Sequence, residues 1–253
     1  MRLRRELILE EMGLTPIWRL RPRQAPTVAR DPVLVGPAPS AEACSPAVAE
    51  RREAPSTSDR RARILLLDWS ALKAEVRGCT ACALHARRTQ TVFGVGDERA
   101  EWLFVGEGPG AEEDARGEPF VGQAGKLLDN MLAAVGLCRG DNVYIANVVK
   151  CRPPGNRNPE PPEVGACEPF LTRQIALIRP RLVVALGRVA AINLLARDAT
   201  IASLRGRLHD YRGTPLVATY HPAYLLRNLA DKAKAWEDLC FARETMKRLQ
   251  DSA

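Results

Sequence analysis

The segment that decides the fold is residues 101–137, EWLFVGEGPGAEEDARGEPFVGQAGKLLDNMLAAVGL. Residues 102–106 form a short, continuous apolar run, which is typical of a buried strand. The end of the segment has apolar residues at helical spacing, namely Leu127, Leu128, Met131, Leu132 and Val135. A glycine-rich loop connects the two parts. The segment therefore predicts a strand, a loop and a helix in succession.

Strands and helices continue to alternate along the chain. Apolar runs predict further strands at residues 142–151, 181–187 and 215–221. Helices are expected at residues 64–79, 161–179, 188–196 and 231–250. Strands that are apolar throughout are typical of a parallel sheet covered on both faces. The sequence therefore predicts an α/β fold, a three-layer α/β/α arrangement around a central four-stranded, mainly parallel sheet.

Polar residues lie at the ends of three of these strands. Gly106, Glu107 and Gly108 follow the first strand, Asn147 lies in the second, and His221 ends the last. In open parallel sheets, ligands bind beyond the carboxyl ends of the strands. We therefore expect these residues to converge on one crevice.

The glycine-rich loop matches neither of two common phosphate-binding motifs. Gly110 comes one position too early for the dinucleotide-binding pattern, and Lys126 is followed by Leu127 where a P-loop has Ser or Thr. The Glu107 carboxylate would also repel a phosphate. The loop is therefore expected to bind a neutral group, or to hold water beside a cationic centre. Phe120, between Pro and Gly, suits a stacking surface, although a lone phenylalanine is more often a core residue.

The N-terminal quarter of the chain differs from the rest. Residues 1–20 contain one candidate amphipathic helix, with Leu7, Leu9 and Met12 on its apolar side. Residues 21–63 are rich in Pro, Ala, Ser and Arg and lack aromatic residues, which predicts a disordered linker. The catalytic or binding domain is expected over residues 64–253.

Charge and hydropathy limit the class of protein. The net charge of +7 indicates a polyanionic partner such as nucleic acid, although a basic protein without such a partner is equally compatible with charge alone. No apolar run approaches the ~18 residues of a membrane span. The charged N-terminus lacks the apolar core of a secretory signal. We expect a cytoplasmic protein with no membrane association.

Four of the seven cysteines have the spacing of a metal or cluster site. Cys79 and Cys82 form a Cys-x-x-Cys pair, and Cys151 and Cys167 flank a loop between a strand and a helix. Four thiolates suit either Zn²⁺ or a [4Fe–4S] cluster. Scattered buried thiols and a redox-active pair are the alternatives, but no thioredoxin-like strand precedes the pair.

Three segments resemble type-4 uracil-DNA glycosylases, the iron–sulfur branch of the uracil-DNA glycosylase superfamily. They are GEGPGAEEDARGEPFVGQAGKLLDNML at residues 106–132, NVVKCRPPGNRNPEPPEVGAC at residues 147–167 and HPAYLLRN at residues 221–228. The resemblance covers about residues 65–250 and leaves the N-terminal segment outside. It implies a monomeric base-excision repair enzyme, associated with the nucleoid, acting on single- or double-stranded DNA that contains uracil. Such an enzyme flips deoxyuridine out of DNA and hydrolyses its N-glycosidic bond.

The resemblance also implies roles for single residues in the pocket. Gly106, Glu107 and Gly108 would form the turn beside the base, and Phe120 would stack on the uracil ring. Asn147 would pair with the uracil edge, since an amide both donates and accepts hydrogen bonds. These roles predict a closed pocket for one flipped base.

The implied catalytic residues are His221, Glu107 and, as a secondary candidate, Glu113. His221 would donate a hydrogen bond to the uracil oxygen that gains charge as the bond breaks. Glu107 would stabilise the positively charged sugar and orient water, whereas many relatives have Asp at the position of Gly108. Glu113 would be a second catalytic carboxylate and would also block the C5 methyl group of thymine, or it would be a solvated charge at a helix start.

The four cysteines, Cys79, Cys82, Cys151 and Cys167, would bind a structural [4Fe–4S] cluster, with Zn²⁺ as the alternative. Contacts with DNA phosphates are implied for three arginines, Arg152, Arg157 and Arg227. The chain has Glu118 where the family usually has Arg. Two other hypotheses remain open, a non-catalytic iron–sulfur module that binds DNA and a zinc-stabilised hydrolase of free nucleosides.

Overall fold

The structure is a computed structural model, and residues 57–252 are described here. The candidate helix within residues 1–20 and most of the predicted linker lie outside these residues. No helix in the described part is long and apolar enough to cross a membrane.

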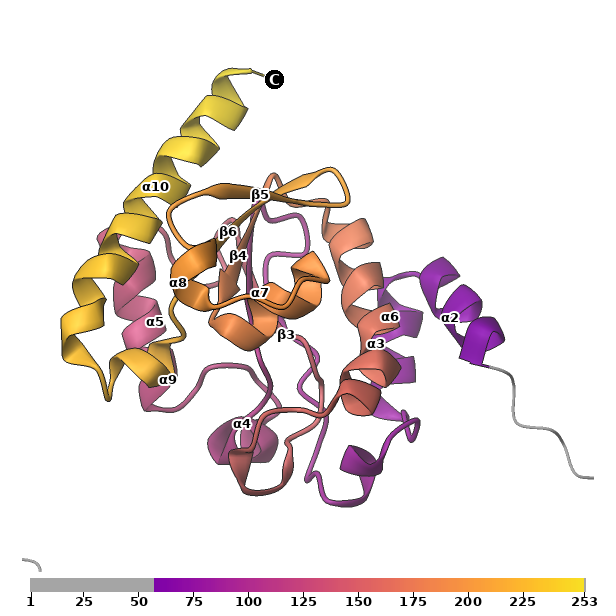
Figure 1. The fold of residues 1–253 in the computed structure, drawn as a ribbon. Helices are drawn as coiled ribbons and strands as arrows, with labels where there is room; N and C mark the ends of the chain where they lie inside the picture. The colour runs from indigo at the N-terminus through magenta and orange to yellow at the C-terminus, as the bar shows by residue number, and fades with distance from the viewer. Residues whose placement is uncertain (1–56, 253) are drawn as a thin grey trace, which may run out of the picture. The chain divides into compact units, whose positions relative to one another are not determined.

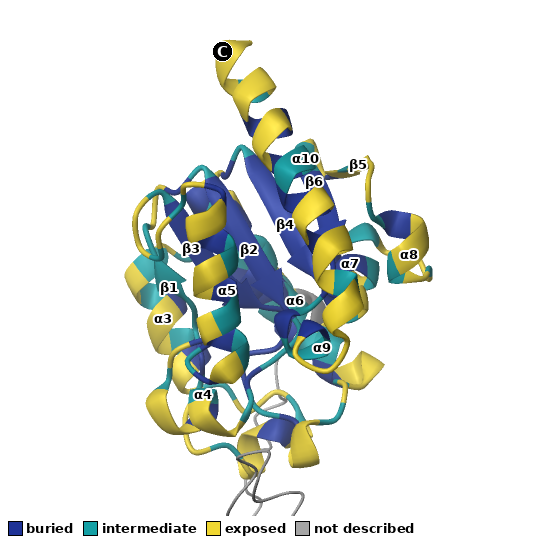
Figure 2. Cartoon of the chain, turned by 90° about the vertical axis from the view of Figure 1, so that its left-hand side faces the viewer, coloured by how far each residue is buried: buried dark blue, intermediate teal, exposed yellow. Residues whose placement is uncertain are grey.

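A single mixed sheet forms the centre of the domain (Figure 1), with the strands in the order β1-β3-β2-β4-β6-β5 (Figure 2). Four central strands run parallel: β3 (Val143–Asn147), β2 (Trp102–Gly106), β4 (Leu182–Leu186) and β6 (Thr214–Thr219). Short antiparallel strands form the two edges, β1 (Val95–Gly96) and β5 (Leu208–Tyr211). The prediction of four parallel strands is confirmed for the centre, but it missed both edges, which are too short or too exposed to give an apolar run.

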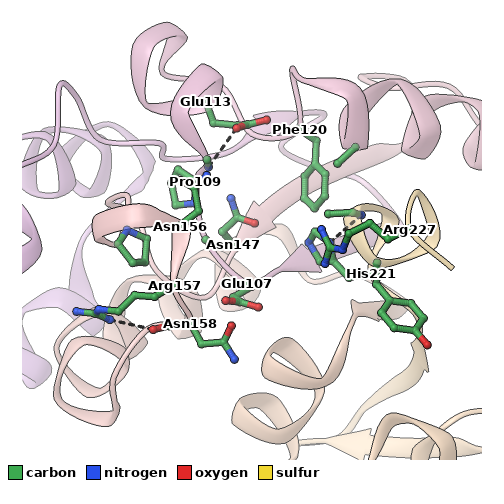
Figure 3. Close-up of a pocket in the computed structure, with 16 residues that line it drawn as sticks. Glu107, Pro109, Glu113, Phe120, Asn147, Asn156, Arg157, Asn158, His221 and Arg227 are labelled. Atoms are coloured by element: carbon green, nitrogen blue, oxygen red, sulfur yellow. Dashed lines mark hydrogen bonds between the residues drawn. The ribbon is translucent and has the colours of Figure 1, made fainter. Parts of the chain in front are cut away.

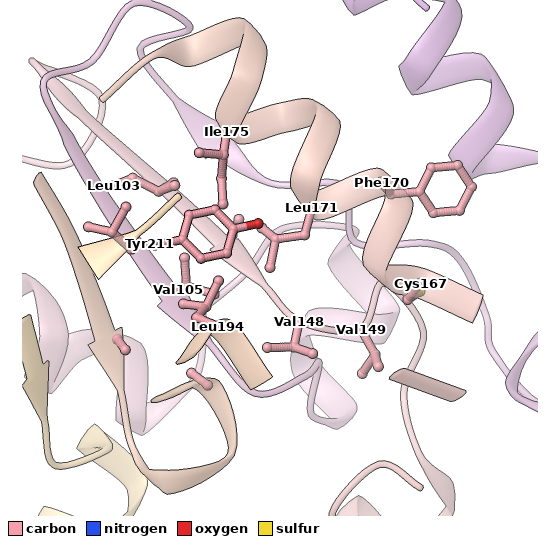
Figure 4. Close-up of a cluster of buried hydrophobic side chains, with 14 of the residues drawn as sticks. Leu103, Val105, Val148, Val149, Cys167, Phe170, Leu171, Ile175, Leu194 and Tyr211 are labelled. Carbon is pink, nitrogen blue, oxygen red and sulfur yellow. The ribbon is translucent and has the colours of Figure 1, made fainter. Parts of the chain in front are cut away.

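Helices cover both faces of the sheet, so the predicted three layers are present (Figures 1 and 2). On one face, α5 (Gln123–Ala134) and α10 (Lys232–Asp251) pack on residues such as Phe104 and Val184. On the other face, α3 (Trp69–Arg77), α6 (Pro161–Ile178) and α7 (Arg188–Leu195) pack on residues such as Val105 and Ala185 (Figure 4). Successive strand residues alternate between the two cores, which is why the parallel strands are apolar at nearly every position before their ends.

The remaining helices are short and lie in the connections. They are α4 (Ala111–Arg116), α8 (Ile201–Leu204), α9 (Pro222–Leu225) and the 3-10 turns η1 (Ala83–Ala86), η2 (Pro154–Asn156) and η3 (Leu229–Asp231). Of these, α4, α9 and η2 follow the strand ends where polar residues were expected.

The start of the domain corrects the predicted boundary. Helix α2 (Thr57–Leu66) begins inside the predicted linker, so residues 57–63 are helical. The single helix predicted over residues 64–79 is instead two helices, because the Asp68 side chain accepts from Ala71 N–H and starts α3. Two arginines of α2 contact α6, where Arg60 donates to Ala166 O and Arg61 pairs with Glu168. These distant contacts leave no apolar pattern in the local sequence.

Candidate active site

Three strand ends surround one cavity of about 380 Å³ (Figure 3). In the sheet register, Gly106 at the end of β2 lies opposite Asn147 at the end of β3, and His221 lies between β6 and α9. Glu107, Phe120, Asn147 and His221 all line the cavity. Its volume is within the range of sites for small ligands. The expected convergence at the carboxyl edge of the sheet is therefore present.

Two rings form one side of the cavity. The Phe120 ring stacks on the His221 ring, with 5.4 Å between centroids and 30° between planes. Phe120 is 6 % exposed and has a φ of 55°, an uncommon backbone conformation for an aromatic residue. The ring therefore contributes a nearly dry surface that is held in place at a cost in backbone energy.

His221 is uncharged at neutral pH and presents a donor. Burial lowers its pKa to about 4, with a smaller effect from the positive charge of Arg227. The Ala223 N–H donates to Nδ1 of His221 at 3.1 Å. This bond assigns the proton of the neutral ring to Nε2. His221 thus supplies an N–H donor without a positive charge.

Asn147 has an unpaired polar atom. The residue is 2 % exposed, and its Oδ1 has no hydrogen-bond partner among the described residues. Buried amide oxygens are nearly always paired, so an unpaired one at a cavity indicates that a ligand supplies the donor. Gly106 allows this packing, since a Cβ there would lie 2.5 Å from Asn147 Oδ1 and 2.6 Å from Phe120 Cζ.

Glu107 places a carboxyl group in the same cavity (Figure 3). Burial raises its pKa above the ordinary value. Its backbone is fixed, because Glu107 O accepts from Val149 N–H at 3.1 Å. At Gly108 a Cβ would lie 2.7 Å from Val149 Cγ2, so this glycine also permits the close approach of the β3 connection.

Both carboxylate oxygens of Glu113, the secondary catalytic candidate, accept hydrogen bonds from the backbone of the loop. Its Oε2 accepts from Gly110 N–H at 3.1 Å, and its Oε1 accepts from Val121 and Gly122 N–H at 3.0 and 3.2 Å. The side chain lines the cavity, but both oxygens brace the backbone on either side of Phe120. This arrangement supports a positioning role.

The three expected DNA-binding arginines differ in their surroundings. Arg227 is exposed at the cavity, and Arg157 also lines it. The Arg157 guanidinium, however, pairs with the buried carboxylate of Glu163, which offsets its charge. Arg152 does not line the cavity, and its Nε donates to Asn156 Oδ1. Arg227 is thus the expected contact best placed beside a ligand.

The four cysteines of the predicted site line one small cavity of their own. Cys79 and Cys82 lie between α3 and η1, Cys151 follows β3, and Cys167 lies in α6. Cys151 and Cys167 are each 4 % exposed. Within residues 57–252, no three His, Cys, Asp or Glu side chains are close enough to share a single metal ion.

The surroundings of these thiols suit thiolate ligands. Arg88 Nη1 donates to Cys151 Sγ at 3.1 Å, and Arg60 Nη2 donates to Cys79 Sγ at 3.5 Å. Burial raises the pKa of Cys167 to about 12 in the free thiol. A buried thiolate therefore needs a bound cationic group and N–H donors to its sulfur. Four thiols in one cavity with such donors fit a thiolate-ligated group.

The fold agrees with comparisons to known proteins. The family model of the uracil DNA glycosylase superfamily matches residues 93–240. The chain belongs to this superfamily. A type-4 uracil-DNA glycosylase of Archaeoglobus fulgidus is 49 % identical over 160 residues, 60 % of this chain and 80 % of the relative. A type-4 enzyme of Thermotoga maritima is 46 % identical over 177 residues, 68 % of this chain and 92 % of the relative.

A more distant branch of the superfamily is also similar. A type-5 uracil-DNA glycosylase of Thermus thermophilus is 36 % identical over 153 residues, 51 % of this chain and 68 % of the relative. The range of the family model contains every residue that lines the cavity. The recognised resemblance to the type-4 branch is therefore confirmed.

Two residues near the uracil-DNA glycosylase pocket make contacts that the sequence did not predict. Arg139 donates to Pro119 O and Phe120 O, both at 2.9 Å, and its Nε donates to Asp129 Oδ1. Lys150 is buried and donates to Asn147 O at 2.9 Å. Both act through backbone carbonyls, which any residue type provides, so motif spacing does not reveal them.

Proposed function

We propose that the protein hydrolyses the N-glycosidic bond of deoxyuridine in DNA, which releases uracil and leaves an abasic site. The observation that carries this proposal is the unpaired Asn147 Oδ1 in a cavity walled by Phe120 and His221. An aromatic face, an amide edge and a neutral N–H donor together match one planar base with polar edges. The relatives named uracil-DNA glycosylase support the same activity.

The aromatic face of Phe120 and the amide of Asn147 together explain how the cavity would recognise uracil. Phe120 stacks on the base, and Asn147 pairs with its neighbouring donor and acceptor atoms. Cytosine has the opposite pattern at this edge, so its binding would leave buried polar groups unpaired. The base reaches the cavity only after it leaves the DNA stack.

Bond cleavage requires charge stabilisation on both sides of the bond. The His221 Nε2–H donates to the uracil oxygen that becomes negative, and such a preorganised donor contributes about 3 kcal/mol. The Glu107 carboxylate stabilises the positively charged sugar and orients the attacking water. Glu113 holds the loop and takes no part in the chemistry.

The cysteine site would hold a structural [4Fe–4S] cluster through Cys79, Cys82, Cys151 and Cys167. The cluster supplies no electron to the hydrolysis, which is not a redox reaction. Bound by these four cysteines, it would join the segment before η1 to the loop after β3 and to α6. Four thiols around one cavity and the resemblance to the iron–sulfur branch support this assignment over Zn²⁺.

We infer that the chain binds uracil-containing DNA as a monomer in the cytoplasm, at the nucleoid. Arg227 lies at the mouth of the cavity and would contact the phosphates beside the flipped nucleotide. Arg152 would contribute at the rim, and Arg157 less, since Glu163 already offsets its charge.

The test is excision from uracil-containing oligonucleotides, followed by alkali to cleave abasic sites. Wild-type protein should release uracil, and Asn147→Ala or His221→Ala should lower the rate by about 100-fold or more. His209→Ala is the matched control, since His209 lies on β5 and its Nε2 contacts Leu204 O. Binding of uracil-containing DNA by cluster-loaded wild type without excision would instead identify a non-catalytic module.

A further inference from the structure

Lys150 is a buried cation beside both the cysteine site and the base pocket. It is 1 % exposed and directly precedes Cys151. Its ammonium donates to two neutral acceptors, Asn147 O at 2.9 Å and Gln174 Oε1 at 2.6 Å. Within residues 57–252, no carboxylate forms an ion pair with it. A buried ammonium is costly, so a simple space-filling role would favour an apolar side chain here.

In the described part of the chain, the Asn147 carbonyl has no partner strand on the side of the sheet where β1 lies. Strand β2 pairs with β3 up to Asn147, but β1 pairs only with Tyr144 and Ile145. On that side the strand end therefore has no neighbouring strand. The Lys150 ammonium supplies the missing donor, and it thereby fixes the backbone that carries the Asn147 amide.

The other contacts of Lys150 lead to the cysteine site. Its own N–H donates to Cys167 Sγ at 3.4 Å, and its carbonyl accepts from Val92 N–H at 2.8 Å. Gln174, on the same helix as Cys167, is fixed in turn, because its Nε2 donates to Phe93 O at 2.9 Å. One residue thus contacts a cysteine ligand and the backbone of Asn147.

We propose that Lys150 is a positioning residue that holds Asn147 in place for uracil and links that position to the cysteine site. The proposal rests on the proposed function. Thiolates at Cys151 and Cys167 would provide a negative counter-charge near the ammonium, which has no carboxylate partner among the described residues. The cysteine site and the lysine would therefore stabilise each other. Hydrogen bonds weaken steeply with misalignment, so a small shift of Asn147 impairs pairing with the base.

The test compares Lys150→Met with wild type in the full, cluster-loaded chain. Two oligonucleotides serve as probes, one with an uncleavable 2′-fluoro-deoxyuridine and one with a tetrahydrofuran abasic site. We expect the variant to keep its iron content and visible absorption. Its affinity for the fluorinated probe should fall by about tenfold, roughly the loss of one hydrogen bond to a charged group. Its affinity for the abasic probe should change by less than about twofold.

A control variant and a second test variant make the result specific. Lys247→Met removes an exposed lysine from α10 and should leave both affinities unchanged. Gln174→Met removes the second acceptor of Lys150 without changing a cysteine or a cavity residue. It should show the same selective loss, and it serves if Lys150→Met does not fold.

The outcomes separate this proposal from the proposed function. If wild type neither binds the fluorinated probe selectively nor excises uracil, the proposed function fails. If wild type does both and Lys150→Met and Gln174→Met match it, the positioning role is overturned. An equal loss of affinity for both probes, or a loss of iron in both variants, also overturns it, because Lys150 would then support only the fold or the cluster.

Discussion

His221 and Glu107 differ in how their protonation serves the site. A charged imidazole would attract the departing uracil anion more strongly, but burial keeps His221 neutral and its Nε2 proton available. In the proposed mechanism Glu107 must instead be ionised, although burial opposes this by raising its pKa. We therefore expect protonation of this carboxylate to limit the reaction in acid.

We expect one acid limb in the pH profile of uracil excision, caused by Glu107. Its pKa is raised above the ordinary 4.5, so the carboxylate and the activity are lost as pH falls through that raised value. His221, with a pKa of about 4, stays neutral across this range and adds no limb at the ordinary histidine value of 6.5. Single-turnover rates measured across acidic and neutral pH would show the limb.

Glu107→Gln tests this assignment. The variant should have a lower but flat rate over the range in which wild type loses activity, because the amide does not titrate. Fluorescence or circular dichroism at each pH would check that the fold persists. A limb near the ordinary histidine value that survives in Glu107→Gln would show that another group limits the reaction.

Among the elements, the connection from β2 to α5 contains a strained backbone at Phe120, and hydrogen bonds from other residues hold this backbone in place. Phe120 has a φ of 55°, which costs about 1–2 kcal/mol for a non-glycine residue. Glu113 holds the amides around it, and Arg139 holds the carbonyls of Pro119 and Phe120. Gly125 completes the arrangement, since a Cβ there would lie 1.8 Å from Phe120 O. The stacking ring is thus held from three sides.

We expect Arg139→Met to lower kcat/KM for uracil excision by about tenfold or more, because charged hydrogen bonds contribute about 1.5–3 kcal/mol each. The variant should remain folded under the assay conditions, because the substitution disturbs Phe120 and not the core. The loss of kcat/KM should therefore not result from unfolding. Arg243→Met, at an exposed position on α10, is the matched control. Wild-type kcat/KM in Arg139→Met would show that the ring needs no such brace.

The elements also show what the sequence could predict. Continuous apolar runs predicted the four parallel strands, and polar residues at their ends predicted the convergence of Glu107, Asn147 and His221. The antiparallel edges escaped prediction because β1 is too short and β5 too exposed to give an apolar run. Helix α2 escaped prediction because it contacts the distant helix α6. The contacts of Arg139 and Lys150 also went unpredicted, because both side chains bind backbone carbonyls. The local sequence pattern therefore predicts where the pocket lies, but not the residues that fix the backbone around it.

For the whole molecule, the cysteine site joins segments that are far apart in the chain. Helix α2 reaches this site although it precedes all four cysteines. Arg60 Nη1 donates to Ala166 O at 2.9 Å, its Nη2 donates to Cys79 Sγ, and its guanidinium lies 5.0 Å from the Phe170 ring centroid. One side chain thereby covers the site from the outside and contacts both Cys79 and the helix that carries Cys167.

We expect Arg60→Met to lose iron faster than wild type under a chelator or an oxidant, by about threefold to tenfold, roughly the loss of one partly exposed charged hydrogen bond. The decay of visible absorption would measure this. Arg63→Met is the matched control, because Arg63 lies exposed on the same helix and pairs with Glu75 of α3 instead. Freshly loaded Arg60→Met should excise uracil at the wild-type rate, since Arg60 does not line the base pocket. Equal iron loss in Arg60→Met and Arg63→Met would mean that α2 packs beside the site without protecting it.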